Sequence, residues 1–150
     1  MVTVTLTRTD VKNMLFAEST NVSRTYKRND GVSDFEEIVI DDQVSKSLDG
    51  AWSEACTKLS EKMHEFLSST SFSPSLATFV FTATGLPDGV QDNIKMYVTD
   101  WMMADWLASV RPEFCQRYIN RYNAQLDDLL RKLYKTRWIS GWKVIIFRTS

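Results

Sequence analysis

The sequence predicts a single-domain α+β protein that is mainly helical, and three observations predict this class. Three long stretches place apolar residues at spacings of three and four, which is the period of an α-helix. These helices are expected at about 42–67, 90–110 and 112–135. Shorter alternating or β-branched segments predict strands at the N-terminus, between the first two helices and at the C-terminus. The length of 150 residues suits one domain, with a helical core over about 41–135 and β-rich ends over 1–40 and 136–150.

The first eight residues alternate between apolar and polar side chains, which predicts a half-buried strand. Its apolar members are Val2, Val4 and Leu6, and its polar members are Thr3, Thr5 and Thr7. Thr9 or Asp10 is then suited to cap a short helix. A polar stretch follows with the turn dipeptide Asp30-Gly31, and its flanks at 24–27 and 35–40 predict a loose hairpin.

The first long helix is expected to begin at Asp41-Asp42, because acidic groups satisfy the free amides of a helix N-terminus and complement its dipole. One apolar stripe then runs along the helix: Val44, Leu48, Trp52, Cys56, Leu59, Met63 and Phe66. The segment 68–75 contains Pro74, which cannot continue a helix, and is expected to end it. The next segment, 76–84, is β-branched and aromatic and predicts a strand.

The helix at 90–110 is apolar over much of its circumference, which predicts a central and largely buried position. Arg111-Pro112 breaks the pattern, because the residue before a proline avoids the helical region, and Pro112 suits the first turn of the next helix. The C-terminal sequence WISGWKVIIFRTS has apolar residues at both alternating parities. We expect a strand there, and a strand that is apolar on both faces has to be covered by this domain or by a neighbour.

No arrangement of residues in the sequence predicts catalysis or metal binding. The single histidine, His64, has no cysteine or aspartate at metal-ligand spacing, and two turns of helix separate it from Cys56 by about 12 Å. Gly-rich phosphate loops and nucleophile elbows are absent from the sequence. Cys56 and Cys115 are expected to be reduced thiols, since two cysteines do not make a disulfide framework. We therefore predict no catalytic, metal or cofactor-binding site, no enzyme activity and no membrane span.

Opposite charges are concentrated in two segments of a chain whose formal net charge is only -1. Residues 30–65 contain ten acidic and three basic side chains, a net charge of −7, whereas residues 111–150 contain nine basic and three acidic ones, a net charge of +6. Two explanations remain open. Either the segments face each other within one molecule, or the acidic surface of one subunit meets the basic surface of the next in a head-to-tail contact that closes into a ring.

Basic and aromatic residues alternate near the C-terminus, a pattern that also occurs in proteins that bind single-stranded nucleic acid. The basic residues are Arg131, Lys132, Lys135, Arg137 and Lys143, and the aromatic ones are Tyr134, Trp138 and Trp142. A favourable helix C-terminus followed by a packed strand explains the same pattern. We prefer this structural explanation and keep nucleic-acid contact as an alternative.

The order of the helices and the placement of aromatic residues resemble those of a known family. Asp41-Asp42 opens a helix of the form D-D-x-V-x-x-x-L-x-x-A-W-x-x-A-C, and an aromatic helix, VTDWMMADWLASVRPEF, precedes a Tyr- and Leu-rich one, YINRYNAQLDDLLRKLYK. Over about residues 41–135 the chain looks like short proteins of phages and prophages of Bacteroidetes-type bacteria that are found among virion structural genes. It also resembles, more loosely, the head–tail connector (adaptor) proteins of tailed phages, which are small helix-rich subunits that form a ring beneath the portal.

The resemblance implies a mechanical function in the neck or tail region of a virion that is assembled in the bacterial host cytoplasm. Such a subunit forms a homo-oligomeric ring, docks on the portal protein and contacts tail and neck proteins, while DNA at most passes through the lumen. A non-ring tail-completion or tail-assembly protein is the alternative, since the β-rich ends go beyond the connector pattern. The candidate subunit-interface residues are Trp138, Trp142, Val144, Ile145, Ile146 and Phe147, the basic Arg131, Lys132, Lys135 and Arg137, and the acidic Asp34, Glu36 and Glu37. We expect a strand at 143–147 to add to the sheet edge of a neighbouring subunit.

Overall fold

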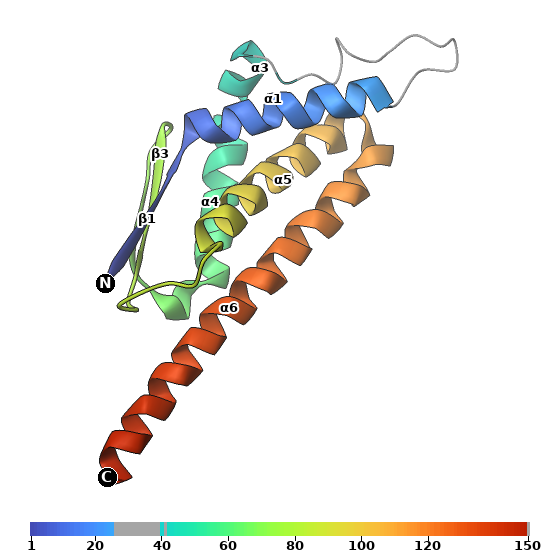
Figure 1. The fold of residues 1–150 in the computed structure, drawn as a ribbon. Coiled ribbons are helices and arrows are strands. Elements are labelled where there is room, and N and C mark those ends of the chain that lie inside the picture. Colours follow the sequence, from blue (N-terminus) through green and yellow to red (C-terminus); the bar gives the residue numbers. More distant parts are fainter. Residues whose placement is uncertain (26–39, 41, 150) are drawn as a thin grey trace.

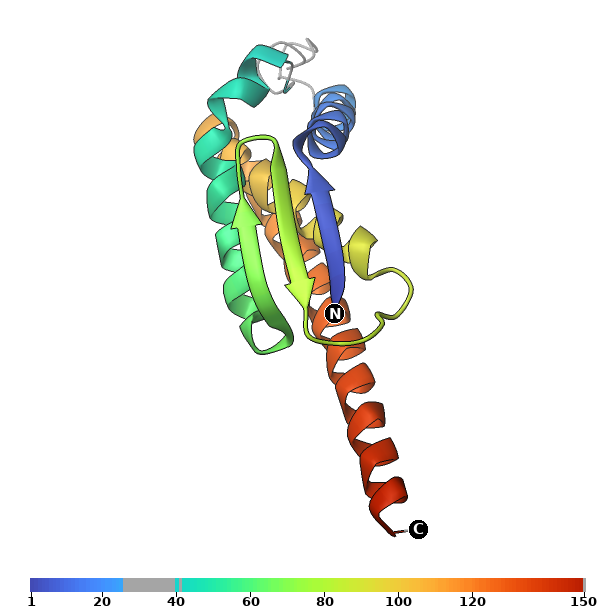
Figure 2. The same cartoon turned by 90° about the vertical axis from the view of Figure 1, so that its left-hand side faces the viewer.

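A three-stranded antiparallel sheet covers one side of a group of helices, as Figure 1 and Figure 2 show. The computed structural model describes residues 1–25, 40 and 42–149, and for 23–25, 42, 43, 46 and 138–149 it describes the backbone alone. The strands are β1 (Val2–Thr7), β2 (Leu67–Phe72) and β3 (Leu76–Phe81), in the spatial order β1-β3-β2. The strands predicted at the N-terminus and at 76–84 are therefore confirmed.

Alternation along the strands places one face of the sheet in the core. The buried inner-face residues, each at most 7% exposed, are Val4, Leu6, Ala77, Phe79 and Phe81. β1 and β2 both pair with β3 in antiparallel orientation, and Val2 and Leu67 both stand opposite Phe81. The two outer strands therefore run in the same direction and begin at the same level of the sheet.

The described helices surround α5, which occupies the centre of the protein. They are α1 (Arg8–Thr25), α3 (Asp42–Ser47), α4 (Asp49–Lys62), α5 (Val90–Val110) and α6 (Cys115–Thr149), with short 3-10 helices η1 (His64–Phe66) and η2 (Pro112–Phe114). α5 contacts α1, α4, α6 and β1, and Figure 1 shows it between them. Its residues Ile94, Val98 and Met102 are fully buried. The predicted central helix is confirmed, as is an α+β class in which helices dominate.

The helix predicted over 42–67 is wrong in its continuity, because the chain turns at Leu48 and again at Met63. The Leu48 N–H donates to the Ser45 carbonyl at 3.1 Å, so α3 and α4 replace one straight helix. The guanidinium of Arg8 also donates to the Ser45 carbonyl at this bend. The spacing of apolar residues within 42–67 carries no information about a contact with a residue so far away in the chain. The apolar stripe itself enters the core as expected, since the following residues are at most 7% exposed: Leu48, Trp52, Cys56, Leu59, Met63 and Phe66.

Residues 67–72 form β2, although the sequence predicted a helix end and a connecting segment there. Only Leu67 and Phe72 of this strand are apolar, so no alternation marks it. Its backbone pairs with β3, and the ring of Phe72 packs against that of Phe79 with centroids 5.5 Å apart. Pairing with β3 therefore outweighs a weak local signal.

Helix α1 is longer than expected and runs to Thr25, so the strand predicted at 24–27 is wrong for its first two residues. The residues that hold α1 in the core, each at most 3% exposed, are Val11, Leu15 and Val22. Because these three residues are separated by many polar ones, the apolar stripe of α1 is weak, and the sequence of this segment gives only a faint helical signal. The rest of the predicted hairpin, at 26–39, and the predicted cap residue Asp41 lie outside the described residues.

Strand β1 passes into α1 without a connecting loop, since Thr7 ends the strand and Arg8 begins the helix. Thr7 is the helix cap, in place of the predicted Thr9 or Asp10, because its hydroxyl oxygen accepts the N–H of Asp10 at 3.3 Å. The N–H of Arg8 donates to the Ser75 carbonyl at 2.9 Å. The junction is thus tied to the turn between β2 and β3.

The strand predicted at the C-terminus, 136–150, is wrong, because α6 continues as one helix from Cys115 to Thr149. Residues 143–147 therefore do not present a strand to a neighbouring sheet. Once a helix exists, each further residue adds a hydrogen bond at small cost, and no proline after Pro112 interrupts this one. The β-branched and aromatic residues of this segment favour a strand only weakly, and extension of the existing helix α6 outweighs that preference.

Candidate functional site

Helix α6 packs against α5 over its first part and then extends past the rest of the protein (Figure 1). Its 35 residues correspond to a length of about 52 Å. The residues of α6 that are buried against the body, each at most 3% exposed, are Tyr118, Leu129 and Leu133. The last twelve residues of the helix, 138–149, account for about 18 Å of this length. This terminal part of α6 is the most distinctive feature of the protein's outline.

Glu65 and Phe66 of η1 form a joint with α6 at the point where the helix leaves the body. The Tyr134 hydroxyl donates to one oxygen of Glu65, and Arg137 Nη1 donates to the other at 2.9 Å. The Tyr134 and Phe66 rings meet edge to face with centroids 4.9 Å apart. The hydrogen bonds from Tyr134 and Arg137 hold the pKa of Glu65 below its usual value. These contacts join Glu65 and Phe66 of η1 to Tyr134 and Arg137 where α6 leaves the body.

Lys132, predicted as an interface residue, takes part in a polar network between α5 and α6. Its ammonium donates to Asn93 Oδ1 at 2.8 Å and pairs with Asp128 at 2.9 Å. The side-chain amide of Asn93 donates to Gln125 at 2.8 Å and to Asp128 at 3.1 Å. Gly89 precedes α5 with φ of 89°, and a Cβ on it would lie 2.9 Å from Lys132 Nζ. The positive φ therefore favours glycine at this position, and a Cβ would also displace the end of the Lys132 side chain.

The other predicted interface residues fall into three groups. Arg131 and Lys135 are exposed on α6, whereas Arg137 pairs with Glu65 and so joins the basic and acidic segments within one molecule. The side chains of the apolar candidates lie outside the description, which gives a helical backbone for Trp138, Trp142, Val144, Ile145, Ile146 and Phe147. Asp34, Glu36 and Glu37 lie in the range that the structure does not describe.

A buried carboxylate that the sequence reading missed, Asp100, lies between α1, α5 and α6 with a side chain only 2% exposed. Its Oδ1 is 3.5 Å from Nη2 of Arg121, and its Oδ2 is buried with no hydrogen-bond partner in the described part of the chain. Arg121 also donates to both oxygens of Glu18, at 3.1 and 3.2 Å. The Tyr118 hydroxyl donates to Glu18 at 3.1 Å. Two acids therefore share one arginine.

The charges of this cluster are unbalanced at neutral pH. Burial raises the pKa of Asp100 to about 6, with Arg121 opposing the rise and Glu18 adding to it. Burial also acts to raise the pKa of Glu18, but the hydrogen bond and charge of Arg121 outweigh it, and that pKa lies below its usual value. Asp100 is enclosed where α1, α5 and α6 meet and is not accessible to a substrate, while the hydrogen bonds of Arg121 with Glu18 link α6 to α1. An available signal was a lone aspartate in the apolar run VTDWMM.

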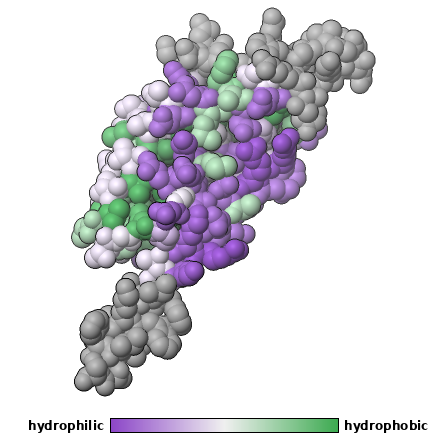
Figure 3. Space-filling model, viewed as in Figure 1, coloured by the Kyte–Doolittle hydropathy of each residue, from purple (hydrophilic) through white to green (hydrophobic). Residues whose placement is uncertain are grey.

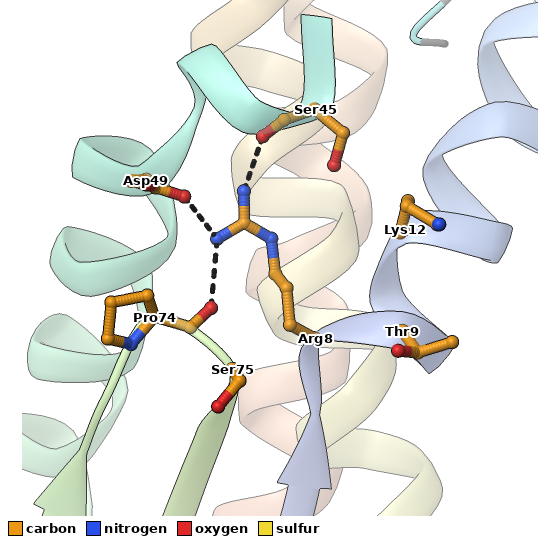
Figure 4. A pocket seen from close by; sticks show the side chains of 7 residues that line it. All are labelled: Arg8, Thr9, Lys12, Ser45, Asp49, Pro74 and Ser75. Atoms are coloured by element: carbon orange, nitrogen blue, oxygen red, sulfur yellow. Dashed lines mark hydrogen bonds and ion pairs between the residues drawn. The ribbon is translucent and has the colours of Figure 1, made fainter. Parts of the chain in front are cut away.

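Arg8 ties α1 to two other parts of the chain, as Figure 4 shows. Its guanidinium donates to Asp49 Oδ1 at 3.0 Å, to the Ser45 carbonyl at 2.5 Å and to the Pro74 carbonyl at 3.4 Å. It also lies 5.4 Å from the centroid of the Trp52 ring. An open cavity of about 370 Å³ adjoins these groups and is lined further by Thr9, Lys12 and Ser75. Because three protein groups already engage the guanidinium, Arg8 stabilises the fold at this cavity.

His64 and Cys56, the two residues considered for chemistry in the sequence, differ in exposure. His64 is exposed, with Nδ1 3.0 Å from the Glu61 carbonyl. Burial raises the pKa of the Cys56 thiol to about 12, which suppresses the thiolate. Within the described residues, no three His, Cys, Asp or Glu side chains are grouped as metal ligands are. The same part of the chain has no helix with the length and apolar character that a bilayer span requires.

The visible surface in Figure 3 divides into two kinds. Hydrophobic residues gather on the side where the sheet lies, and hydrophilic residues cover the side of α5 and α6. Met1 and Leu76, at 81% and 40% exposure, contribute exposed apolar side chains at the two ends of the sheet. The sheet side is therefore the more apolar of these two sides.

These features define a small α+β protein whose buried polar groups hold its own elements together and whose last helix extends from the body. In comparisons with known proteins, no family model, no curated protein and no solved structure matches the chain.

Proposed function

We propose that this protein is a virion structural subunit, a head–tail connector or neck protein that forms a ring, docks on the portal protein and links head to tail. The terminal part of α6 is the observation that carries the proposal. Seven of its twelve residues, 138–149, are apolar, although the helix extends past the body (Figure 1). A helix with so many apolar residues is stable when neighbouring protein covers it.

Burial of the terminal part of α6 in a partner would supply a large share of the free energy that assembly requires. Burying an apolar side chain is worth at least about 1.5 kcal/mol, so seven give on the order of 10 kcal/mol. Association costs roughly 4–15 kcal/mol in lost freedom of motion. Burial of the helix in a partner therefore offsets most of this cost, and further contacts supply the rest.

The base of the helix supports the same function. The Glu65 joint and the packing on α5 hold α6 in one direction, so little conformational freedom is lost when a partner binds it. Arg131 and Lys135 are exposed on α6 before the terminal part. They favour an acidic partner surface and steer its approach.

A tail-completion or tail-assembly protein that does not form a ring is the second candidate. The same helix would then bind in the groove of a different protein, as amphipathic helices do. Closed particles of uniform symmetry distinguish a ring subunit from this alternative.

Deletion of residues 138–150 tests the proposal. The full-length and shortened chains are compared by light scattering and negative-stain electron microscopy, each alone and with a portal protein. We expect rings from the full-length chain and monomers from the shortened one, with unchanged circular dichroism. Assembly of the shortened chain, or failure of the full-length chain to bind itself or a portal, refutes the proposal.

A double substitution, Ile145→Lys with Ile146→Lys, keeps the length of α6 while removing apolar character. We expect it to block assembly as the deletion does. Ser53→Lys with Thr57→Lys, at two exposed positions on α4, adds the same two charges, is the matched control and should assemble normally.

A further inference from the structure

Among the residues that the structure describes, no strand pairs with the outer edge of β1 or of β2, and both strands pair with β3. Proteins usually block such edges with charged residues, proline or bulges. β1 (VTVTLT) has no charge, no proline and no bulge. β2 (LSSTSF) has a register irregularity near its start but is otherwise equally unprotected.

We propose that β1 of one copy pairs with β2 of a second copy, so that the sheets of neighbouring subunits join head to tail. The inference rests on the proposed function, that of a self-assembling subunit, and it names the contact that joins one subunit to the next.

The geometry of the two edges suits a second copy of this chain. β1 and β2 are each six residues long and run in the same direction. Thr5 and Ser71 both stand opposite Thr78, so the two edges are also at the same level. A copy displaced sideways, without a shift along the strands, therefore places β2 beside β1 as a parallel neighbour.

The chemistry of the edges is also compatible with self-association. Neither strand contains a charged side chain, so two copies approach without like-charge repulsion. The outer-face residues beside the edges are exposed and carry hydroxyl groups: Thr3, Thr5, Ser69 and Ser71. Side-by-side placement would continue one hydroxyl-lined surface across the junction, where such side chains pair favourably.

The number of strand edges left open favours head-to-tail contacts over a symmetric dimer. One six-residue junction covers roughly 20 Å by 10 Å on each partner. A stable interface needs about 1,000 Å² in total, so in either arrangement a single junction has to be supplemented by other contacts, such as those proposed for the terminal part of α6. A β1–β1 dimer uses one edge per copy and leaves β2 open. A head-to-tail series uses both edges of every copy, and closure into a ring leaves no free edge.

Disulfide cross-linking in the full-length chain tests the pairing. Thr5→Cys and Ser71→Cys are introduced together in a Cys56→Ala, Cys115→Ser background that retains the native fold by circular dichroism. Within one copy the two positions flank β3, two strand spacings or about 9.5 Å apart, which is too far for a disulfide. Cross-links in the folded protein therefore form only between copies.

Under mild oxidation we expect the double-cysteine chain to give a ladder of dimers, trimers and larger species. A mixture of the two single-cysteine chains should give mixed dimers only. Dimers from Thr5→Cys alone would show β1–β1 pairing and overturn the inference. Absence of cross-links in particles that do assemble overturns it and leaves the proposed function standing, whereas a chain that never assembles overturns both.

Charge substitution on the edge gives an independent measurement. Thr3→Lys with Thr5→Lys should lower the assembled fraction at least ten-fold, because lysine on an edge blocks strand addition. Thr78→Lys with Val80→Lys is the matched control, since it places the same two charges opposite Thr5 and Thr3 but on the central strand. We expect this control to assemble within two-fold of the unchanged chain. Equal loss in both variants contradicts the edge contact.

Discussion

Replacing Asp100 with asparagine is expected to change how the stability of the protein depends on pH. The pKa of Asp100 is about 6 in the folded protein, against an ordinary value of 3.8, because the carboxyl is buried and shares Arg121 with Glu18. Since the folded pKa is the higher one, the protonated form favours folding. Its contribution is fully present below about pH 4 and is lost as the pH rises through 6.

The size of the effect follows from the shift. Two pKa units correspond to about 3 kcal/mol in the free energy of unfolding, of which about 1.4 kcal/mol is lost between pH 5 and pH 7.5. For a chain of 150 residues this is roughly 3–5 °C in Tm. Glu18 acts in the opposite sense at lower pH, because its pKa lies below the ordinary value of 4.5, and so it contributes little in this window.

Thermal unfolding followed by circular dichroism at pH 5, 6 and 7.5 measures the effect. The Tm of Asp100→Asn relative to that of the unchanged chain should rise by roughly 3–5 °C from pH 5 to pH 7.5. Asp105→Asn, an exposed acid on the same helix, is the control and should show no such trend. Parallel curves of Tm against pH for Asp100→Asn and the unchanged chain would refute the electrostatic reasoning.

Three further predictions follow from other contacts. Arg8→Met should lower the free energy of unfolding in urea by about 2–3 kcal/mol because it leaves two carbonyls without this donor, whereas Asp49→Asn, at a side chain 62% exposed, should cost under about 1 kcal/mol. Gly89→Ala should cost about 1–2 kcal/mol because φ is 89°, while Gly50→Ala, which meets open space in α4, should be neutral or stabilising in the same titration. Cys56 should resist Ellman's reagent at pH 8 until the chain unfolds, since burial raises its pKa to about 12, and rapid native labelling would contradict this.

The elements that the sequence predicted well are those whose pattern is local. Alternation in the first residues defines β1, and the apolar circumference of 90–110 defines the central α5. The elements that it missed depend on partners far away in the chain. β2 contains two apolar residues, and its pairing with β3 rather than its composition makes it a strand. At the C-terminus, composition favoured a strand, whereas continuity with α6 makes a helix.

The same distinction applies to the candidate site. Sequence charge indicated Arg137 as a contact residue, and it does make an ion pair, but with Glu65 of the same chain, 72 positions away. The Glu18–Arg121 contact spans 103 positions and leaves no trace in any window of the sequence. The position of Asp100 among apolar residues is compatible with a buried charge, but the sequence does not show that Arg121 and Glu18 lie beside it. Long-range polar contacts of this kind are visible only in the folded chain.

The direct passage from β1 to α1 has a mechanical consequence. With no residue between Thr7 and Arg8, there is no slack between sheet and helix. A load applied along β1 reaches α1 at once, and it is shared by the three groups that hold the Arg8 guanidinium and by the Ser75 carbonyl that holds its backbone. β1 and α1 are therefore expected to move as one rigid unit. Because no flexible loop lies between them, tension passes from the sheet to the helix.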